Sequence, residues 1–133
     1  MLTKRTTYVR VASTLGPVVL FALLLAGCDD ESSRTAPPDN GGDADRGATL
    51  IRQYGCGGCH TIPGIAGANG LVGPPLTLMA RRIYIAGVLR NSPDNMMTWI
   101  ESPQQVIPGN AMPDMGIGQT DARDITAYLY TLR

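Results

Sequence analysis

Two thiols and one imidazole lie within five consecutive residues, Cys56-Gly57-Gly58-Cys59-His60. Residues three apart in a helical turn share a face, so both sulfurs can reach the two vinyl groups along one edge of a porphyrin. Each thiol can add across a vinyl group to form a thioether, and the imidazole that follows can bind the iron. The spacing therefore predicts one haem c, attached through Cys56 and Cys59, with His60 as an axial ligand.

Three other kinds of site use a similar pair of cysteines. A redox-active dithiol needs a context of alternating strands and helices, which this sequence does not indicate. A structural zinc site needs four ligands, and the chain has only Cys28 as a further cysteine and no second histidine. A simple disulfide loop is the third alternative.

The composition limits the partners and the size of the core. A chain of 133 residues suits one domain with an extension. From Cys28 onward it has eight arginines, no lysine and eleven acidic residues, and no basic patch that could hold nucleic acid. This part also lacks phenylalanine, so a buried porphyrin would supply much of the apolar surface. We therefore expect the haem-free domain to be poorly folded.

Residues 1–27 have the pattern of an export signal. Three basic residues and no acid come first, an apolar run follows, and Ala26-Gly27 precede Cys28. Leu25-Ala26-Gly27-Cys28 resembles the bacterial lipoprotein signal-peptidase box, which implies that Cys28 becomes the lipidated first residue of the mature protein. The lipid would hold the domain on the periplasmic, outer face of the cytoplasmic membrane. An uncleaved signal anchor is the alternative, and a soluble secreted form is a third.

The remaining chain divides into a linker and an all-α domain. Residues 28–42 are acidic and rich in serine, proline and glycine, which indicates a flexible tether. In residues 43–133, apolar spacing predicts a first helix from about Ala44 to Tyr54, stopped by Gly55. A second helix is expected from Ser92-Pro93 to about Glu101, with Ser92 as its cap. A third would begin at a Thr120 cap and end at Arg133.

The second axial ligand must come from a residue other than histidine, because His60 is the only one. Met112 lies in the loop Pro108-Gly109-Asn110-Ala111-Met112-Pro113, where two prolines restrict the backbone and can hold a thioether in place. Met115 is its rival, and an iron that is open or bound to water is a further alternative. The other methionines sit on helical apolar patterns and are interpreted as core residues: Met79, Met96 and Met97.

Residues 43–133 resemble a class I, monohaem cytochrome c, including the domains of this family that are fused to haem–copper oxidases or serve them. The resemblance implies a small all-α fold in which three main helices and long loops surround one covalently bound haem. It also implies that the first and last helices cross where Gly47 meets Tyr128. It rests on these residues: Gly47, Cys56-Gly57-Gly58-Cys59-His60, Gly73-Pro74-Pro75-Leu76, Arg82, Trp99, Pro108-Gly109-Asn110-Ala111-Met112-Pro113 and Tyr128.

The resemblance also assigns roles around the haem. Met112 matches the distal ligand of the family, and the Pro74 carbonyl would accept a hydrogen bond from His60 Nδ1. Asn110 is expected close to the Met112 sulfur. Buried carboxylates need donors, so Trp99 and one further side chain are candidates to bind the haem propionates: Arg81, Arg82 or Tyr84.

The function implied is one-electron transfer without catalysis of a substrate reaction. A terminal oxidase is the expected acceptor, and a quinol-oxidising complex or another redox protein the expected donor. Because no lysine remains to steer docking, contacts should depend on small apolar side chains around the haem edge. The alternatives are a fixed haem c subunit of a respiratory complex, and a haem peroxidase or sensor whose methionine ligand leaves the iron.

Overall fold

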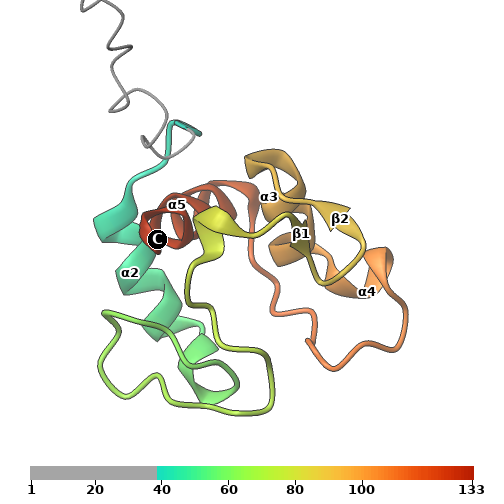
Figure 1. Cartoon of the computed structure of the whole chain (residues 1–133), viewed down its shortest axis with the longest axis horizontal. Coiled ribbons are helices and arrows are strands. Elements are labelled where there is room, and N and C mark those ends of the chain that lie inside the picture. The colour runs from blue at the N-terminus through green and yellow to red at the C-terminus, as the bar shows by residue number, and fades with distance from the viewer. Residues whose placement is uncertain (1–38) are drawn as a thin grey trace, which may run out of the picture. The chain divides into compact units, whose positions relative to one another are not determined.

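The computed structural model describes residues 39–133, and the expected export signal, Cys28 and most of the linker lie outside this range. Helix α5 (Gln119–Thr131) contacts α2 (Ala44–Gln53) on one side and α3 (Pro93–Glu101) on the other (Figure 1). The prediction of an all-α domain with three main helices is confirmed. No helix among the described residues is both long and apolar enough to cross a bilayer.

The smaller elements were not predicted from the sequence. They are the four-residue helix α4 (Pro103–Val106), the 3-10 turns η2 (Cys56–Gly58) and η3 (Met79–Arg81), and the antiparallel hairpin of β1 (Tyr84–Ile85) and β2 (Leu89–Arg90). Tyr84 pairs with Arg90 in the hairpin, and Ile85 pairs with Leu89. Strands of two residues are too short to show an alternation of apolar and polar side chains.

Two of the three main helices begin at a side-chain cap, and one of these caps, Ser92, was predicted. The Asp43 carboxylate accepts hydrogen bonds from the N–H groups of Asp45 and Arg46, at 2.9 and 3.0 Å, so α2 starts at Ala44. Ser92 Oγ accepts from Asn95 N–H at 3.3 Å and begins α3. Both side chains satisfy N–H groups that have no partner inside the helix.

The prediction that Thr120 caps the last helix was wrong. Helix α5 begins at Gln119 and ends at Thr131, and Gly118 is its cap residue although it has no side chain to bond. The Gly118 carbonyl accepts from Ala122 N–H at 2.9 Å, and Ile117, immediately before the cap, is buried. We infer that the burial of Ile117 sets the start of α5, since tertiary packing overrides a weak capping preference.

Gly47 allows α2 and α5 to cross closely, and the backbone of Asp124 lies nearest to it. A Cβ on Gly47 would lie 2.6 Å from the carbonyl carbon of Asp124 and nearer still to the oxygen, so only glycine fits. Tyr128 lies one turn further along α5, where its hydroxyl donates to the Pro63 carbonyl at 2.6 Å. The predicted role of Gly47 at the crossing is therefore confirmed, and its contact with Tyr128 stays a prediction.

Asn91 joins α5 to the segment between η3 and the hairpin. Its Nδ2 donates to the carbonyls of Met79 and Arg82, at 2.7 and 2.8 Å. Its Oδ1 accepts from the Tyr130 hydroxyl at 2.6 Å, and burial raises the pKa of Tyr130 to about 12. Both ends of the amide are satisfied, so the network holds this segment in one position.

Arg46 links α2 to two carboxylates of α5. Its Nη2 lies 2.5 Å from Asp121 Oδ1, and its Nη1 bonds Asp124 Oδ2. Asp124 Oδ1 also accepts from Asp43 N–H at 2.8 Å. Burial acts to raise the pKa of Asp124, but the hydrogen bonds from Asp43 N–H and Arg46 outweigh it and hold that pKa below its ordinary value.

Asp124→Asn should lower the free energy of unfolding by about 1–3 kcal/mol near neutral pH, because it removes one of the two carboxylates that bind Arg46 and the charged acceptor of Asp43 N–H. The folded-state pKa of Asp124 is depressed, so the carboxylate stabilises the fold fully above its ordinary pKa of 3.8. This contribution is lost as the pH falls through the folded-state value. Urea melts of the haem-loaded proteins should show the difference between wild type and variant shrinking below that pH.

The control for this experiment is Asp94→Asn, which removes a carboxylate that belongs to neither ion pair. It should cost less stability near neutral pH than Asp124→Asn. A difference between wild type and Asp124→Asn that stayed constant down to the lowest pH would contradict the assigned role of the carboxylate.

Candidate functional site

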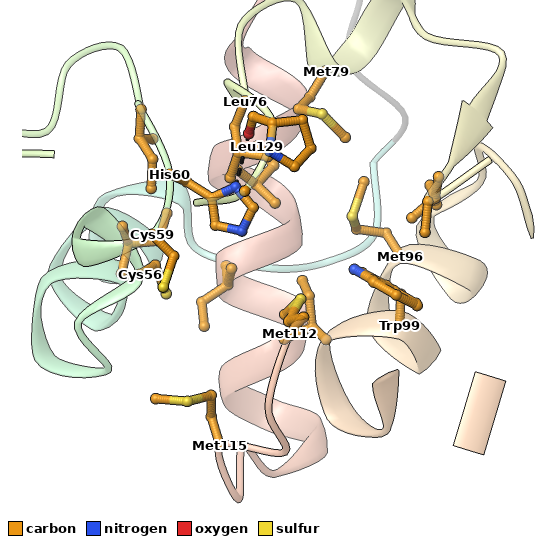
Figure 2. A pocket seen from close by; sticks show the side chains of 18 of the residues that line it. Cys56, Cys59, His60, Leu76, Met79, Met96, Trp99, Met112, Met115 and Leu129 are labelled. Atoms are coloured by element: carbon orange, nitrogen blue, oxygen red, sulfur yellow. Dashed lines mark hydrogen bonds between the residues drawn. The ribbon is translucent and has the colours of Figure 1, made fainter. Parts of the chain in front are cut away.

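The cysteine segment forms the compact turn that its spacing predicts. His60 N–H donates to the Cys56 carbonyl at 3.0 Å, and Cys59 N–H donates to the same oxygen at 3.2 Å. Cys56 and Cys59 are free thiols, and Figure 2 shows them side by side at one wall of a cavity. Before any group is attached to it, burial is the main cause that raises the pKa of the Cys56 thiol.

His60 projects into the same cavity and is oriented by a backbone carbonyl. Its Nδ1–H donates to the Pro74 carbonyl at 2.7 Å, drawn as a dashed line in Figure 2. A carbonyl can only accept, so Nδ1 carries the proton and Nε2 keeps its lone pair for a metal. The hydrogen bond from Nδ1–H to the carbonyl also makes Nε2 a stronger ligand for a metal.

The cavity has a volume of about 360 Å³ and lies within the core rather than beside it. Core residues form its back wall, including Ile51 of α2, Ile100 of α3 and Leu129 of α5. No aspartate or glutamate lines it within the described part of the chain. An apolar cavity with two thiols at one wall and an imidazole that faces inward fits a porphyrin joined through both sulfurs.

The loop between α4 and α5 carries Met112, and two amide side chains fix it. Asn110 Oδ1 accepts from Met112 N–H at 2.7 Å, while its Nδ2 donates to the carbonyls of Pro103 and Ile107, at 2.9 and 2.7 Å. Gln104 Nε2 donates to the Met112 carbonyl at 2.7 Å. Asn110 was expected near the sulfur; its amide holds the backbone of the loop instead, and Gln104 was not anticipated.

The methionines of the domain occupy different depths. Met112 is half-buried, and Figure 2 shows its sulfur pointing into the cavity on the side that faces His60. Met115 is 41% exposed and lies at the edge of the cavity. Met79 and Met96 are 4% and 2% exposed and belong to the core cluster, as predicted, and Met97 packs against that cluster.

The candidates for the propionates do not all reach the cavity. Arg82, Tyr84 and Trp99 line it, whereas Arg81 does not. Trp99 Nε1–H forms no hydrogen bond within residues 39–133, and Figure 2 shows it turned toward the cavity. Arg82 Nη2 already donates to the carbonyls of Pro75 and Thr77, the latter at 3.1 Å. Trp99 therefore offers a free donor, while Arg82 also braces the loop after His60.

A small helical fold around an apolar cavity, with a Cys-x-x-Cys-His turn in its wall, defines a c-type haem protein. Residues 44–133 match the family described as Cytochrome c, so the chain belongs to the cytochrome c family. Membership establishes covalent haem c at Cys56 and Cys59, and supports a role in electron transfer.

The domain is also similar to a subunit of a respiratory enzyme. It is 34% identical over 91 residues to cytochrome c oxidase subunit 2 of Alkalihalophilus pseudofirmus. The aligned region is 68% of this chain and 26% of that protein, so the chain spans about a quarter of the length of its curated relative. The likeness therefore concerns the haem domain alone.

Proposed function

We propose that the protein is a one-electron carrier whose haem iron is bound by His60 on one face and Met112 on the other. The observation that carries this proposal is the convergence of both side chains on the cavity that the two thiols line. A haem c with an imidazole and a thioether as axial ligands cycles between Fe(III) and Fe(II) at a comparatively high potential.

The residues around the iron support transfer of electrons rather than a chemical reaction. His60 is oriented through Pro74, and Asn110 and Gln104 hold the Met112 loop, so both ligands are restrained before and after the electron arrives. With both axial positions filled, no substrate reaches the metal. A carboxylate that a peroxidase could use as a general base is missing from the cavity wall formed by residues 39–133. We therefore propose that the protein is not an enzyme.

The proposed partners are a terminal oxidase as acceptor and a quinol-oxidising complex or another redox protein as donor. The similarity to an oxidase subunit supports the choice of acceptor. Three exposed side chains form the mouth of the cavity, and we call them the docking rim: Val72, Tyr84 and Met115, at 72%, 52% and 41% exposure. They suit small apolar contacts with a partner.

Val72→Asp should lower the second-order rate constant of electron transfer to the oxidase from the same membranes by about tenfold, since a buried charge at the rim costs more than 1 kcal/mol. Val88→Asp is the matched control, because Val88 is 55% exposed but does not line the cavity. The wild-type rate should change less than about twofold between low and physiological salt, since apolar contacts are not screened.

Equal rates for Val72→Asp and Val88→Asp would refute the docking rim, and a steep loss of the wild-type rate with salt would show that charges govern the encounter. Stoichiometric purification with the oxidase in detergent and high salt would instead identify the chain as a fixed subunit.

We also propose that lipid on Cys28 holds the domain at the outer face of the cytoplasmic membrane. The signal pattern of residues 1–27 supports this, and a tether would raise the local concentration of the partners. The intact mass of protein from native membranes tests it. We expect a chain that begins at an acylated Cys28, and a mature chain that retains Met1 would refute the proposal.

A further inference from the structure

The backbone of Gly73 lies against the ring of His60. A Cβ built on Gly73 would be 2.6 Å from His60 Nδ1 and 2.8 Å from Nε2, and slightly nearer to Cε1 between them. An atom in the ring plane beyond Cε1 would be much farther from both nitrogens than from Cε1. The near equality of these distances therefore places the Cβ position over the face of the imidazole.

His60 has little freedom to move away from a larger neighbour. Real Cβ atoms essentially never lie within 3.0 Å of another heavy atom, so a methyl group on Gly73 would displace the ring or the loop. The ring is held at Nδ1 by the Pro74 carbonyl, 2.7 Å away. In the proposed function the iron holds it at Nε2, and this inference rests on that ligation. The movement that remains to the ring is a tilt about the line between its Nδ1 and Nε2 atoms.

The loop that carries Gly73 is also restrained. Gly73 N–H donates to the Cys59 carbonyl at 2.8 Å, and Leu76 N–H donates to the Thr61 carbonyl at 2.8 Å. Arg82 adds a hydrogen bond to the Pro75 carbonyl. These bonds pull the loop onto the residues on both sides of His60, so the backbone cannot retreat without breaking them.

We propose that Gly73 is a positioning residue whose bare Cα sets the tilt of the His60 imidazole over the haem. It works with Pro74, which fixes the proton and one end of the ring. The orientation of the axial imidazole affects how its orbitals overlap with the iron, and the strength of this ligand helps to set the reduction potential. The residue would therefore tune the electron carrier through contact with a ligand, without touching the haem itself.

Two other glycines provide matched controls. Gly42 is also tightly packed, but its Cβ would meet the backbone of α5, 2.6 Å from the Arg123 carbonyl oxygen, and Gly42 does not line the cavity. Gly42→Ala should therefore destabilise the fold without contacting the ring. Gly58 has no atom within 4 Å of its Cβ position and does not have a positive φ, so Gly58→Ala should change little.

The experiment uses haem-loaded full-length protein and measures the hyperfine-shifted proton resonances of the ferric haem methyl groups, whose spread reports the orientation of the axial imidazole. Gly73→Ala should reorder or compress this spread and shift the electron-exchange equilibrium with a mediator of fixed potential at least threefold. Gly42→Ala should keep the wild-type spread and equilibrium while lowering the melting temperature.

A Gly73→Ala protein that melts lower but keeps both the methyl pattern and the equilibrium would overturn the proposal, because Gly73 would then act through packing alone. If Gly73→Ala fails to load haem, the wild-type protein decides. Nuclear Overhauser effects between the Gly73 α protons and His60 Hε1 are expected, and their absence would overturn it. If the His60 ring protons lack hyperfine shifts altogether, His60 is not the ligand, and the proposed function fails instead.

Discussion

Replacing Met112 by alanine should abolish the sulfur-to-iron absorption band near the red edge of the ferric spectrum and open the ferrous iron to carbon monoxide at neutral pH. Met112 is held by Asn110 and Gln104 with its sulfur in the cavity. Within residues 39–133, no other methionine is held in this way. Met115 is exposed at the edge of the cavity, and Met79 and Met96 belong to the core cluster. Loss of the thioether also removes the ligand that raises the reduction potential, so the potential should fall.

Met115→Ala is the matched control, since it removes a methionine from the same loop. It should keep the band, exclude carbon monoxide and retain the wild-type potential. A Met112→Ala protein that kept its band, with loss of the band in Met115→Ala, would transfer the ligand role to Met115. Carbon monoxide binding to the ferrous wild-type protein would favour an open iron and the peroxidase or sensor alternative.

The second large effect concerns folding: the double variant Cys56→Ala/Cys59→Ala, expressed without haem, should show no cooperative unfolding transition. Its core residues would surround an empty space of about 360 Å³. An enclosed cavity costs roughly 24 cal/mol per Å³, so an unfilled space of this size would cost at most about 9 kcal/mol, comparable to the whole stability of a typical small domain. The domain should therefore remain largely unfolded until a porphyrin fills the cavity.

Circular dichroism during urea titration measures this result. Haem-loaded Met112→Ala is the control, because it retains the covalent porphyrin while it loses an axial ligand, and it should still melt cooperatively. Adding free haem to the double variant should restore part of the helical signal. A sharp, haem-independent melt of the double variant would show that the helices form an adequate core by themselves.

The segments that the sequence predicted well are those governed by neighbouring residues. The start of α2 was predicted from apolar spacing and that of α3 from the Ser92 cap, which acts within one turn, and both helices begin where expected. Thr120 has the same chemistry and does not cap α5, because the buried Ile117 places the chain before the helix in a different register. Local propensity predicts a helix boundary when no tertiary contact competes with it.

Residues that act across long stretches of sequence were harder to predict. Asn91 has a clear role only once Met79 and Tyr130 lie beside it. Gln104 looked like an ordinary polar residue until the Met112 loop folded back over α4. Neither Asn91 nor Gln104 stands out in the sequence, because an asparagine or glutamine that holds a loop cannot be told from one that faces solvent by its spacing or its neighbours.

The sequence by itself determined the attachment of the cofactor, because Cys56, Cys59 and His60 lie within one turn and their geometry follows from local backbone structure. Only the tertiary structure decided which groups surround that turn. Gly47 lies against the backbone of Asp124, and Gly73 lies over the face of His60. Contacts between residues far apart in the chain depend on how helices and loops pack, and packing is settled by the shape of the whole core.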